Sequence, residues 1–200
     1  MMKPLFYNPN LLPDVSVAIV EIDTSGQILK AEAQSKFARF AANIAANENL
    51  EIIKTELGKP LAKNSDLNLS LSHSKYWGAA AVSKHHLLGI DVETLENRIE
   101  RIAHKFLQPQ EIESITQNRI EMLTLYWSAK ESLYKLYSKK QLDFANQLLI
   151  KPFELNNEGE LFTSIKIDAQ TEIKNITLKY KFFDTHVLTV ASLPQEMLIS

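Results

Sequence analysis

The stretch LLGIDVET, residues 87–94, predicts a buried strand that carries two acidic side chains. Its leucine, isoleucine and valine residues are typical of a buried strand, yet Asp91 and Glu93 interrupt the apolar run. Because alternate side chains of a strand point the same way, both carboxylates face one side together. Buried carboxylates are costly unless something neutralises them. The strand therefore needs water, a lysine or a metal ion beside these two side chains.

The stretch WSAKESLYK, residues 127–135, predicts part of a long helix over residues 118–140. Trp127, Glu131 and Lys135 recur at every fourth position and so follow one helical face. On its own, this pattern fits an amphipathic helix with a buried tryptophan and a Glu–Lys pair worth about 0.2–0.5 kcal/mol. If Glu131 instead faces the acidic strand, three carboxylates converge, which is the all-oxygen ligand set that Mg²⁺ prefers.

The rest of the pattern predicts an α+β protein made of two similar-sized lobes. Each lobe is expected to pack a small sheet against one main helix, with a pseudo-twofold relation between the lobes. We place residues 1–86 in the N-terminal lobe and residues 87–200 in the C-terminal lobe. The other expected elements are strands at 15–22, 67–74, 77–83 and within 150–193, a short strand and turn at 51–60, a turn at 24–27, a helix at 32–50, and short helices at 99–107 and 108–115.

The composition is that of an ordinary globular protein. The chain has 200 residues, of which 45% are hydrophobic and 23% charged. It contains no cysteine, which excludes disulfides and cysteine-ligated zinc, and its net charge of −2 does not suggest nucleic-acid binding. The N-terminal residues do not match a signal peptide, and no run approaches the roughly 20 apolar residues of a membrane span. We therefore expect a cytoplasmic protein.

The two quoted stretches resemble the signatures of the phosphopantetheinyl transferase superfamily, which are a G-[IV]-D-x-E strand and a W-x-x-K-E-[SA]-x-x-K helix. Three further segments are similar to this family: LGKP at 57–60, LSLSHSKYWGAAAVS at 69–83 and HKFLQPQE at 104–111. The resemblance extends over residues 57–193. The length resembles that of the monomeric Sfp-type members and not that of the short trimeric synthases.

The resemblance implies an enzyme that transfers the 4′-phosphopantetheine arm of coenzyme A to a serine of an apo acyl or peptidyl carrier protein. The second product would be adenosine 3′,5′-bisphosphate. Asp91, Glu93 and Glu131 would be the ligands of Mg²⁺, or of Mn²⁺ in its place. Lys135 would reach the pyrophosphate oxygens, and Glu131 and Lys135 would be the catalytic pair. We expect a monomer without nucleic-acid or membrane partners.

The resemblance also implies a set of coenzyme-binding side chains. Lys59 and His73 would contact the nucleotide phosphates, Lys130 would line the same pocket, and Lys36 would face the 3′-phosphate. The base that takes the serine proton stays open between Glu131 and a water on the metal ion. Beside Lys130, Lys135 and a bound metal ion, the Glu131 carboxyl is expected to have a depressed pKa and so to be a good ligand but a weak base.

Two other functions fit the same residues. Three carboxylates and two lysines also suit a Mg²⁺-dependent phosphohydrolase that acts on a nucleotide diphosphate, although no water-activating residue separate from the ligands is evident. A non-catalytic binding module with a vestigial site is the third reading. The intact set of acidic and basic residues argues against it.

Overall fold

The computed structural model describes residues 4–21, 31–139 and 141–198. The chain folds as a mixed α+β protein with antiparallel sheets and few helices, which confirms the predicted fold class. Among the helices of these residues, none is both long and apolar enough to cross a membrane.

The first sheet has four antiparallel strands in the order β1-β2-β6-β5. One long helix, α1, and a short hairpin accompany it. The bounds of these elements are β1 Pro4–Leu12, β2 Val15–Glu21, β5 Asn68–His73, β6 Trp77–Ser83, α1 Ala31–Ala46, and β3 Ile52–Lys54 with β4 Pro60–Ala62 in the hairpin.

The second sheet has five antiparallel strands in the order β7-β11-β10-β9-β8. In the sequence, β7 precedes the long helix α3 and the other four strands follow it. The bounds are β7 His86–Thr94, β8 Leu148–Ile150, β9 Glu158–Lys166, β10 Glu172–Phe183, β11 His186–Pro194, α2 Pro109–Ser114 and α3 Arg119–Tyr137, with 3₁₀ helices η1 at Asn97–Lys105 and η2 at Gln195–Leu198.

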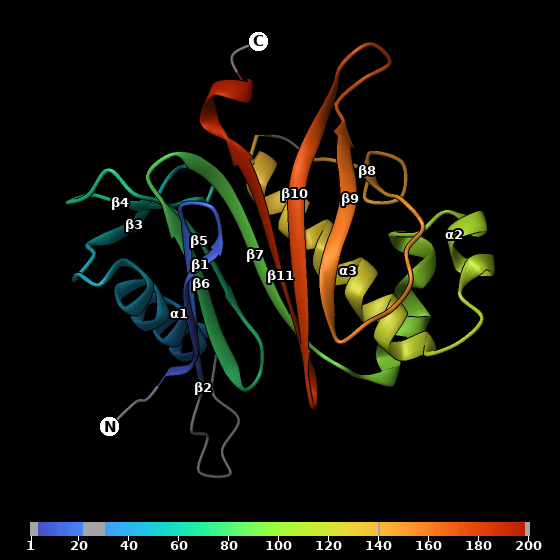
Figure 1. The fold of residues 1–200 in the computed structure, drawn as a ribbon, viewed down its shortest axis with the longest axis horizontal. Coiled ribbons are helices and arrows are strands. Elements are labelled where there is room, and N and C mark those ends of the chain that lie inside the picture. The colour runs from blue at the N-terminus through green and yellow to red at the C-terminus, as the bar shows by residue number, and fades with distance from the viewer. Residues whose placement is uncertain (1–3, 22–30, 140, 199–200) are drawn as a thin grey trace.

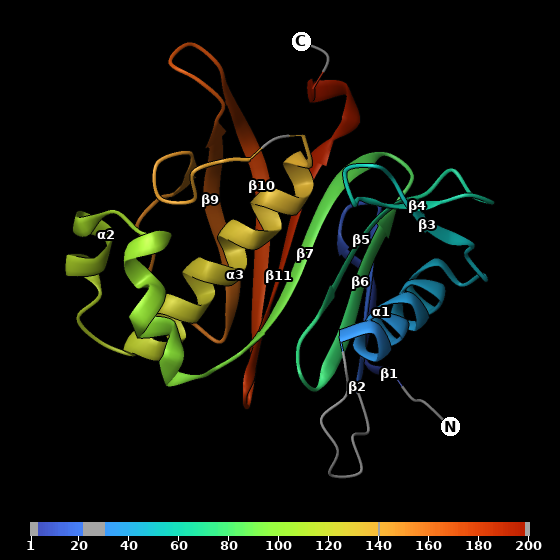
Figure 2. The same ribbon diagram turned by 180° about the vertical axis from the view of Figure 1, so that it is seen from behind.

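The two sheets lie between the two long helices (Figure 1). Apolar side chains of β2 and β6 pack against those of β7 and β11, so the inner faces of the sheets share one core. The outer face of the first sheet packs on α1, and the outer face of the second packs on α3. Seen from behind, α3 runs along β7 and β11 (Figure 2).

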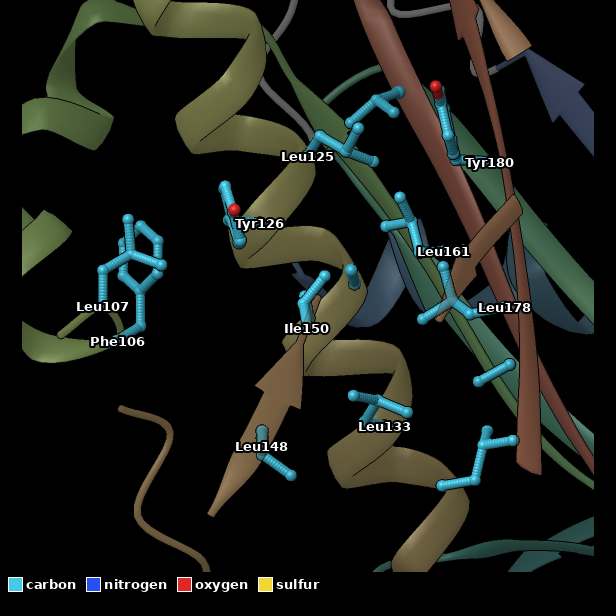
Figure 3. Packing of buried hydrophobic residues seen from close by; sticks show 14 of the residues in the cluster. Phe106, Leu107, Leu125, Tyr126, Leu133, Leu148, Ile150, Leu161, Leu178 and Tyr180 are labelled. Atoms are coloured by element: carbon cyan, nitrogen blue, oxygen red, sulfur yellow. The ribbon is translucent and has the colours of Figure 1, made fainter. Parts of the chain in front are cut away.

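The largest cluster of buried apolar side chains joins α3 to β8, β9, β10 and β11. Figure 3 shows Leu125 and Leu133 of α3 near Leu161 and Leu178 of the sheet. All four side chains are fully buried or nearly so. This packing fixes α3 on the sheet and therefore sets which helix residues face the acidic strand.

Strand β7 and helix α3 approach each other closely because of Gly89. A Cβ atom at Gly89 would lie 1.8 Å from the carbonyl oxygen of Ser132 in α3, so only glycine fits. Side chains alternate along the strand, and Asp91 and Glu93 therefore point to the same side as Gly89, toward α3. Leu88, Ile90 and Val92 point the other way, into the core between the sheets. The glycine thus brings the helix against the acidic side of β7.

Several expectations differ from the structure at the element level. Strand β1 was not anticipated, because its two prolines and irregular register hide the alternation that marks a strand; prolines are tolerated on an edge strand such as this one. The segment 51–60 belongs to a two-stranded hairpin, and the short helix expected at 99–107 is a 3₁₀ helix at Asn97–Lys105. The expected turn at 24–27 lies outside the described residues.

Candidate functional site

Asp91 is neutralised by Lys135. The Lys135 Nζ atom donates a hydrogen bond to Asp91 Oδ1 at 2.7 Å, and the Asp91 side chain is almost fully buried. Ser72 of β5 also donates to Asp91 Oδ1, at 2.9 Å, and accepts a hydrogen bond from Lys135 at 3.1 Å. One strand from each sheet, β5 and β7, and helix α3 therefore meet at the Asp91 carboxylate. In this structure a lysine, one of the alternatives open from the sequence, offsets the buried charge.

Glu93 is held by Trp127. The indole Nε1 atom donates to Glu93 Oε1 at 2.9 Å. The pKa of Glu93 is raised to about 7, because burial and the nearby Asp91 charge disfavour its ionised form. The Trp127 hydrogen bond opposes this shift. Glu93 thus changes charge close to neutral pH.

Glu131 lies within electrostatic reach of both strand carboxylates. Its pKa is raised to about 6 by burial and by the Asp91 charge, and Lys135 only partly offsets these effects. The expected depression of this pKa concerns a carboxyl that also contacts a metal ion, so it stays a prediction. Burial outweighs the lysines because Lys135 pairs with Asp91 and Lys130 turns elsewhere.

An open cleft with a volume of about 380 Å³ runs from the tip of the β3–β4 hairpin to the C-terminal end of α3. Lys59, Lys135 and Lys139 line it, together with Tyr134 and Ser70. Burial and the neighbouring Lys139 charge lower the pKa of Lys59. The cleft therefore gathers cationic groups from two segments and connects them to the Asp91–Lys135 pair.

His73 and Lys36 occupy different places. His73, at the end of β5, lies within electrostatic reach of Lys135 and Asp91, and burial with the Lys135 charge lowers its pKa. Lys36 is exposed on α1 and is not among the residues that line the cleft. Lys59 and Lys135 thus line one cleft, and His73 lies near Lys135 without lining that cleft. The assignment of Lys36 stays a prediction without structural support.

Lys130 does not face the cleft. Its side chain is fully buried, and its Nζ atom donates to the carbonyl oxygens of Phe106 at 2.7 Å and Phe144 at 3.0 Å. It also forms an ion pair with Glu111 at 3.3 Å. Neighbouring positions on a helix project about 100° apart, so Lys130 and Glu131 serve different faces of α3. As folded, the ammonium has no free side for a coenzyme, which corrects the expected coenzyme contact.

The carboxylates have the chemistry to bind a hard cation, but they do not form a complete coordination site as they stand. Within the described residues, no three acidic or histidine side chains converge closely enough to hold a metal ion as they stand. Asp91 Oδ2, however, is buried without a hydrogen-bond partner in that part of the chain, and two further carboxyls with raised pKa lie near it. An orphaned oxygen beside two carboxyls matches oxygen ligation of a divalent cation.

The sequence that forms this site matches a known family. The model of the "4′-phosphopantetheinyl transferase superfamily" matches residues 87–191, just over half of the chain. The chain belongs to this superfamily. This confirms the family that the two signatures suggested. The match spans β7 through most of β11 and so includes Asp91, Glu93, Glu131 and Lys135.

A curated relative agrees with the superfamily assignment. The chain is 34% identical over 97 residues to the 4′-phosphopantetheinyl transferase gsp of Aneurinibacillus migulanus. The alignment covers 46% of this chain and 40% of that relative. The matched part is thus less than half of the relative's length.

Sequence reasoning did not identify Ser72 and Trp127 as hydrogen-bond partners of the site carboxylates. Ser72 lies in the SLSHS segment and joins Asp91 to Lys135, and Trp127 lies in the WSAKES segment and binds Glu93. A signal was present for Trp127, because it shares a helical face with Glu131 and Lys135. The alternation of SLSHS likewise places Ser70 and Ser72 on one side of β5, and both accept hydrogen bonds from backbone N–H groups of β7.

Proposed function

We propose that the protein transfers the 4′-phosphopantetheine arm of coenzyme A to a serine of an apo acyl or peptidyl carrier protein and releases adenosine 3′,5′-bisphosphate. The observation that carries the proposal is the Asp91–Lys135 pair, which joins the two superfamily signatures at the end of a lysine-lined cleft. The relative's name, a 4′-phosphopantetheinyl transferase, supports the same reaction.

The cleft suits the anionic part of coenzyme A. Lys59 and Lys139 lie on its walls, and Lys135 links it to the carboxylates. Clustered cationic side chains at a partly enclosed surface attract and orient a polyphosphate ligand. We propose that Lys59 and His73 contact the nucleotide phosphates, and that Lys135 contacts the diphosphate, of which the 5′-phosphate is the inner phosphate.

Asp91, Glu93 and Glu131 would hold Mg²⁺ or Mn²⁺. A divalent cation at this position supplies Lewis-acid stabilisation to a diphosphate. The carboxyls of Glu93 and Glu131 have to lose their protons to act as ligands, so cation binding is expected to strengthen with pH.

The transfer step requires a positioned donor and a base. The serine oxygen attacks the β-phosphorus, the bond from that phosphorus to the bridging oxygen breaks, and the departing phosphate keeps the electron pair. Lys135 can donate a hydrogen bond to the departing oxygens. Glu131 would hold the cation beside the reacting diphosphate, and a carboxylate or a water on the cation can accept the serine proton there. The base is therefore either Glu131 or a water on the cation.

The proposal also includes a monomeric, cytoplasmic enzyme and a lobe boundary between residues 86 and 87. The arrangement of the sheets supports that boundary, since the strands of the first sheet end at Ser83 and β7 of the second begins at His86.

Intact-mass analysis of several apo carrier proteins tests the proposal. Each carrier is incubated with the protein and coenzyme A, with Mg²⁺ or with EDTA. We expect a gain of one phosphopantetheine mass on at least one carrier, only with Mg²⁺. Cleavage of coenzyme A in the absence of any carrier would favour a phosphohydrolase instead. Coenzyme A binding without cleavage or carrier modification would favour a binding module.

A further inference from the structure

Lys130 joins three chain segments that are distant in sequence. Its fully buried ammonium binds the carbonyl oxygen of Phe106 at the end of η1, the carbonyl oxygen of Phe144 in the loop after α3, and the Glu111 carboxylate of α2. A buried lysine is retained only where hydrogen bonds and a counter-ion satisfy it, and here both are present. The side chain therefore fixes where these segments lie against α3.

The two residues whose carbonyls bind Lys130 also hold Trp127. The Phe106 ring contacts the Trp127 ring edge-on with centroids 5.2 Å apart, and the Phe144 ring stacks on it with centroids 5.5 Å apart. Trp127 in turn donates its indole hydrogen to Glu93 at 2.9 Å. A continuous set of contacts thus leads from Lys130 to a carboxylate of the candidate site.

We propose that Lys130 is a positioning residue that orients Glu93 through a clamp formed by Phe106, Phe144 and Trp127. The proposal rests on the proposed function, in which Glu93 is a ligand of the cation. Lys130 fixes the backbone of both phenylalanines, their rings fix the indole plane, and the indole N–H fixes one oxygen of Glu93. Outer partners that orient a metal ligand typically change metal affinity 10–100-fold when removed.

A test of Lys130 has to change Glu111 as well, so that a loss of stability is not mistaken for a loss of positioning. Removing the lysine alone would leave Glu111 without its partner, and a half-removed buried pair destabilises the fold. Glu111 also accepts the N–H of Gln108 at the start of α2, at 2.7 Å. Lys130→Met combined with Glu111→Gln removes both charges and keeps an acceptor for Gln108. This pair retains the packing volume but loses the hydrogen bonds to both carbonyls.

The test measures the indole N–H of Trp127 by ¹⁵N NMR in the metal-free protein, and then Mn²⁺ affinity by electron paramagnetic resonance. The Trp77→Phe variant assigns the signal. Lys179→Met is the matched control, because the half-buried Lys179 also binds one backbone carbonyl, that of Leu11, at 3.2 Å. Lys179 alternates along β10 with Leu178 and Tyr180, which pack in the same cluster as α3, so it lies on the opposite face of the sheet from Trp127. A second variant, Phe144→Leu, keeps the carbonyl that binds Lys130 and removes only the ring.

In the Lys130→Met/Glu111→Gln protein we expect a shifted or split indole signal and about a 10-fold loss of Mn²⁺ affinity. Phe144→Leu is expected to change the indole signal in the same direction, and Lys179→Met to leave both measurements unchanged. An unchanged indole signal with wild-type Mn²⁺ affinity in the folded double variant would overturn the proposal. The indole measurement needs no cation. If the wild-type protein binds no Mn²⁺, that result counts against the proposed function, and the indole signal of the double variant still tests the clamp.

Discussion

The Nζ atom of Lys135 lies 2.7 Å from Oδ1 of Asp91, although the two residues are 44 positions apart and belong to α3 and β7. This contact joins the strand signature to the helix signature. It also places an ammonium beside an orphaned carboxylate oxygen, Asp91 Oδ2, at the end of a cleft lined by lysines. A bound cation would then pair with the Asp91 carboxylate, and a bound diphosphate would pair with the Lys135 ammonium.

Asp91→Asn is expected to lower the transfer rate at least about 100-fold while the protein stays folded, because the Lys135 side chain is 28% exposed and its ammonium keeps contact with water. Asparagine keeps an oxygen that accepts from Ser72 and Lys135 but removes the charge needed to hold a cation. Carrier mass and the thermal midpoint are measured together. A variant that transfers at the wild-type rate would exclude Asp91 from the site.

Lys135→Met is expected to reduce kcat about 100-fold or more, because the donor nearest the reacting diphosphate is lost. Lys139→Met is the matched control, since Lys139 is exposed on the wall of the same cleft. It is expected to raise KM for coenzyme A by no more than about 10-fold and to leave kcat nearly unchanged. Equal losses of kcat in both variants would contradict the special position of Lys135.

Glu93 should make the metal-free protein less stable as the pH rises. Its folded pKa of about 7 lies above the usual 4.5, so the folded state holds a proton more tightly than the unfolded state. The resulting stabilisation is present below pH 4.5 and is lost as the pH rises through 7, by at most about 3 kcal/mol. Glu93→Gln removes this dependence and keeps an acceptor for Trp127.

Thermal melts in EDTA at pH 5 and pH 8 measure the effect of Glu93. The difference between the two pH values should shrink in Glu93→Gln and stay as in the wild type in Glu113→Gln, which makes the same change at an exposed position of α2. An identical pH dependence in all three proteins would contradict the burial effect at Glu93.

His186 should act in the opposite direction at lower pH. It is buried, stacks on Trp77 with centroids 4.0 Å apart, and contacts Thr94 and Thr185. Burial lowers its pKa from 6.5 to about 4, so it stabilises the fold above pH 6.5 and this contribution is lost as the pH falls toward 4. The loss is at most about 3 kcal/mol.

Urea unfolding at pH 7 and pH 4.5 tests His186. His186→Gln is expected to be less sensitive to acid than the wild type, whatever its stability at pH 7. His85→Gln makes the same change at an exposed position and is expected to behave as the wild type. Wild-type acid sensitivity in His186→Gln would rule out this contribution.

Gly89→Ala is expected to cost about 3 kcal/mol or more, because the new Cβ would meet the Ser132 carbonyl oxygen at 1.8 Å and force α3 away from β7. Gly58→Ala is the control: among the described residues, no atom lies within 4 Å of its added Cβ, and only its φ of 81° is strained. That strain costs about 1 kcal/mol. Equal costs at both positions would disprove the close helix–strand contact.

The sequence predicts the elements that carry regular patterns. The apolar alternation around Asp91 and the helical spacing from Trp127 to Lys135 are local properties, and both elements form where expected. The signatures were also sufficient to identify the superfamily. Strand β1 could not be predicted because an irregular, proline-containing edge strand lacks such a pattern.

The electrostatics of the site depend on tertiary structure and were harder to predict. Lys130 and Glu131 are adjacent in sequence, and only the packing of α3 shows that one is buried against Glu111 while the other faces the strand carboxylates. The raised pKa of Glu131 likewise follows from burial, which a charge pattern does not reveal. The clamp around Trp127 arises from η1 and the loop after α3, which meet only in the fold.

The most direct test of the central claim counts both products in one reaction. Wild-type protein is mixed with coenzyme A, Mg²⁺ and the apo carrier that it prefers, and adenosine 3′,5′-bisphosphate is measured by chromatography while carrier mass is followed. The account predicts one bisphosphate released for each carrier that gains a phosphopantetheine arm, and neither product with Asp91→Asn. Bisphosphate release without a matching gain of carrier mass, or no reaction with any carrier, would contradict it.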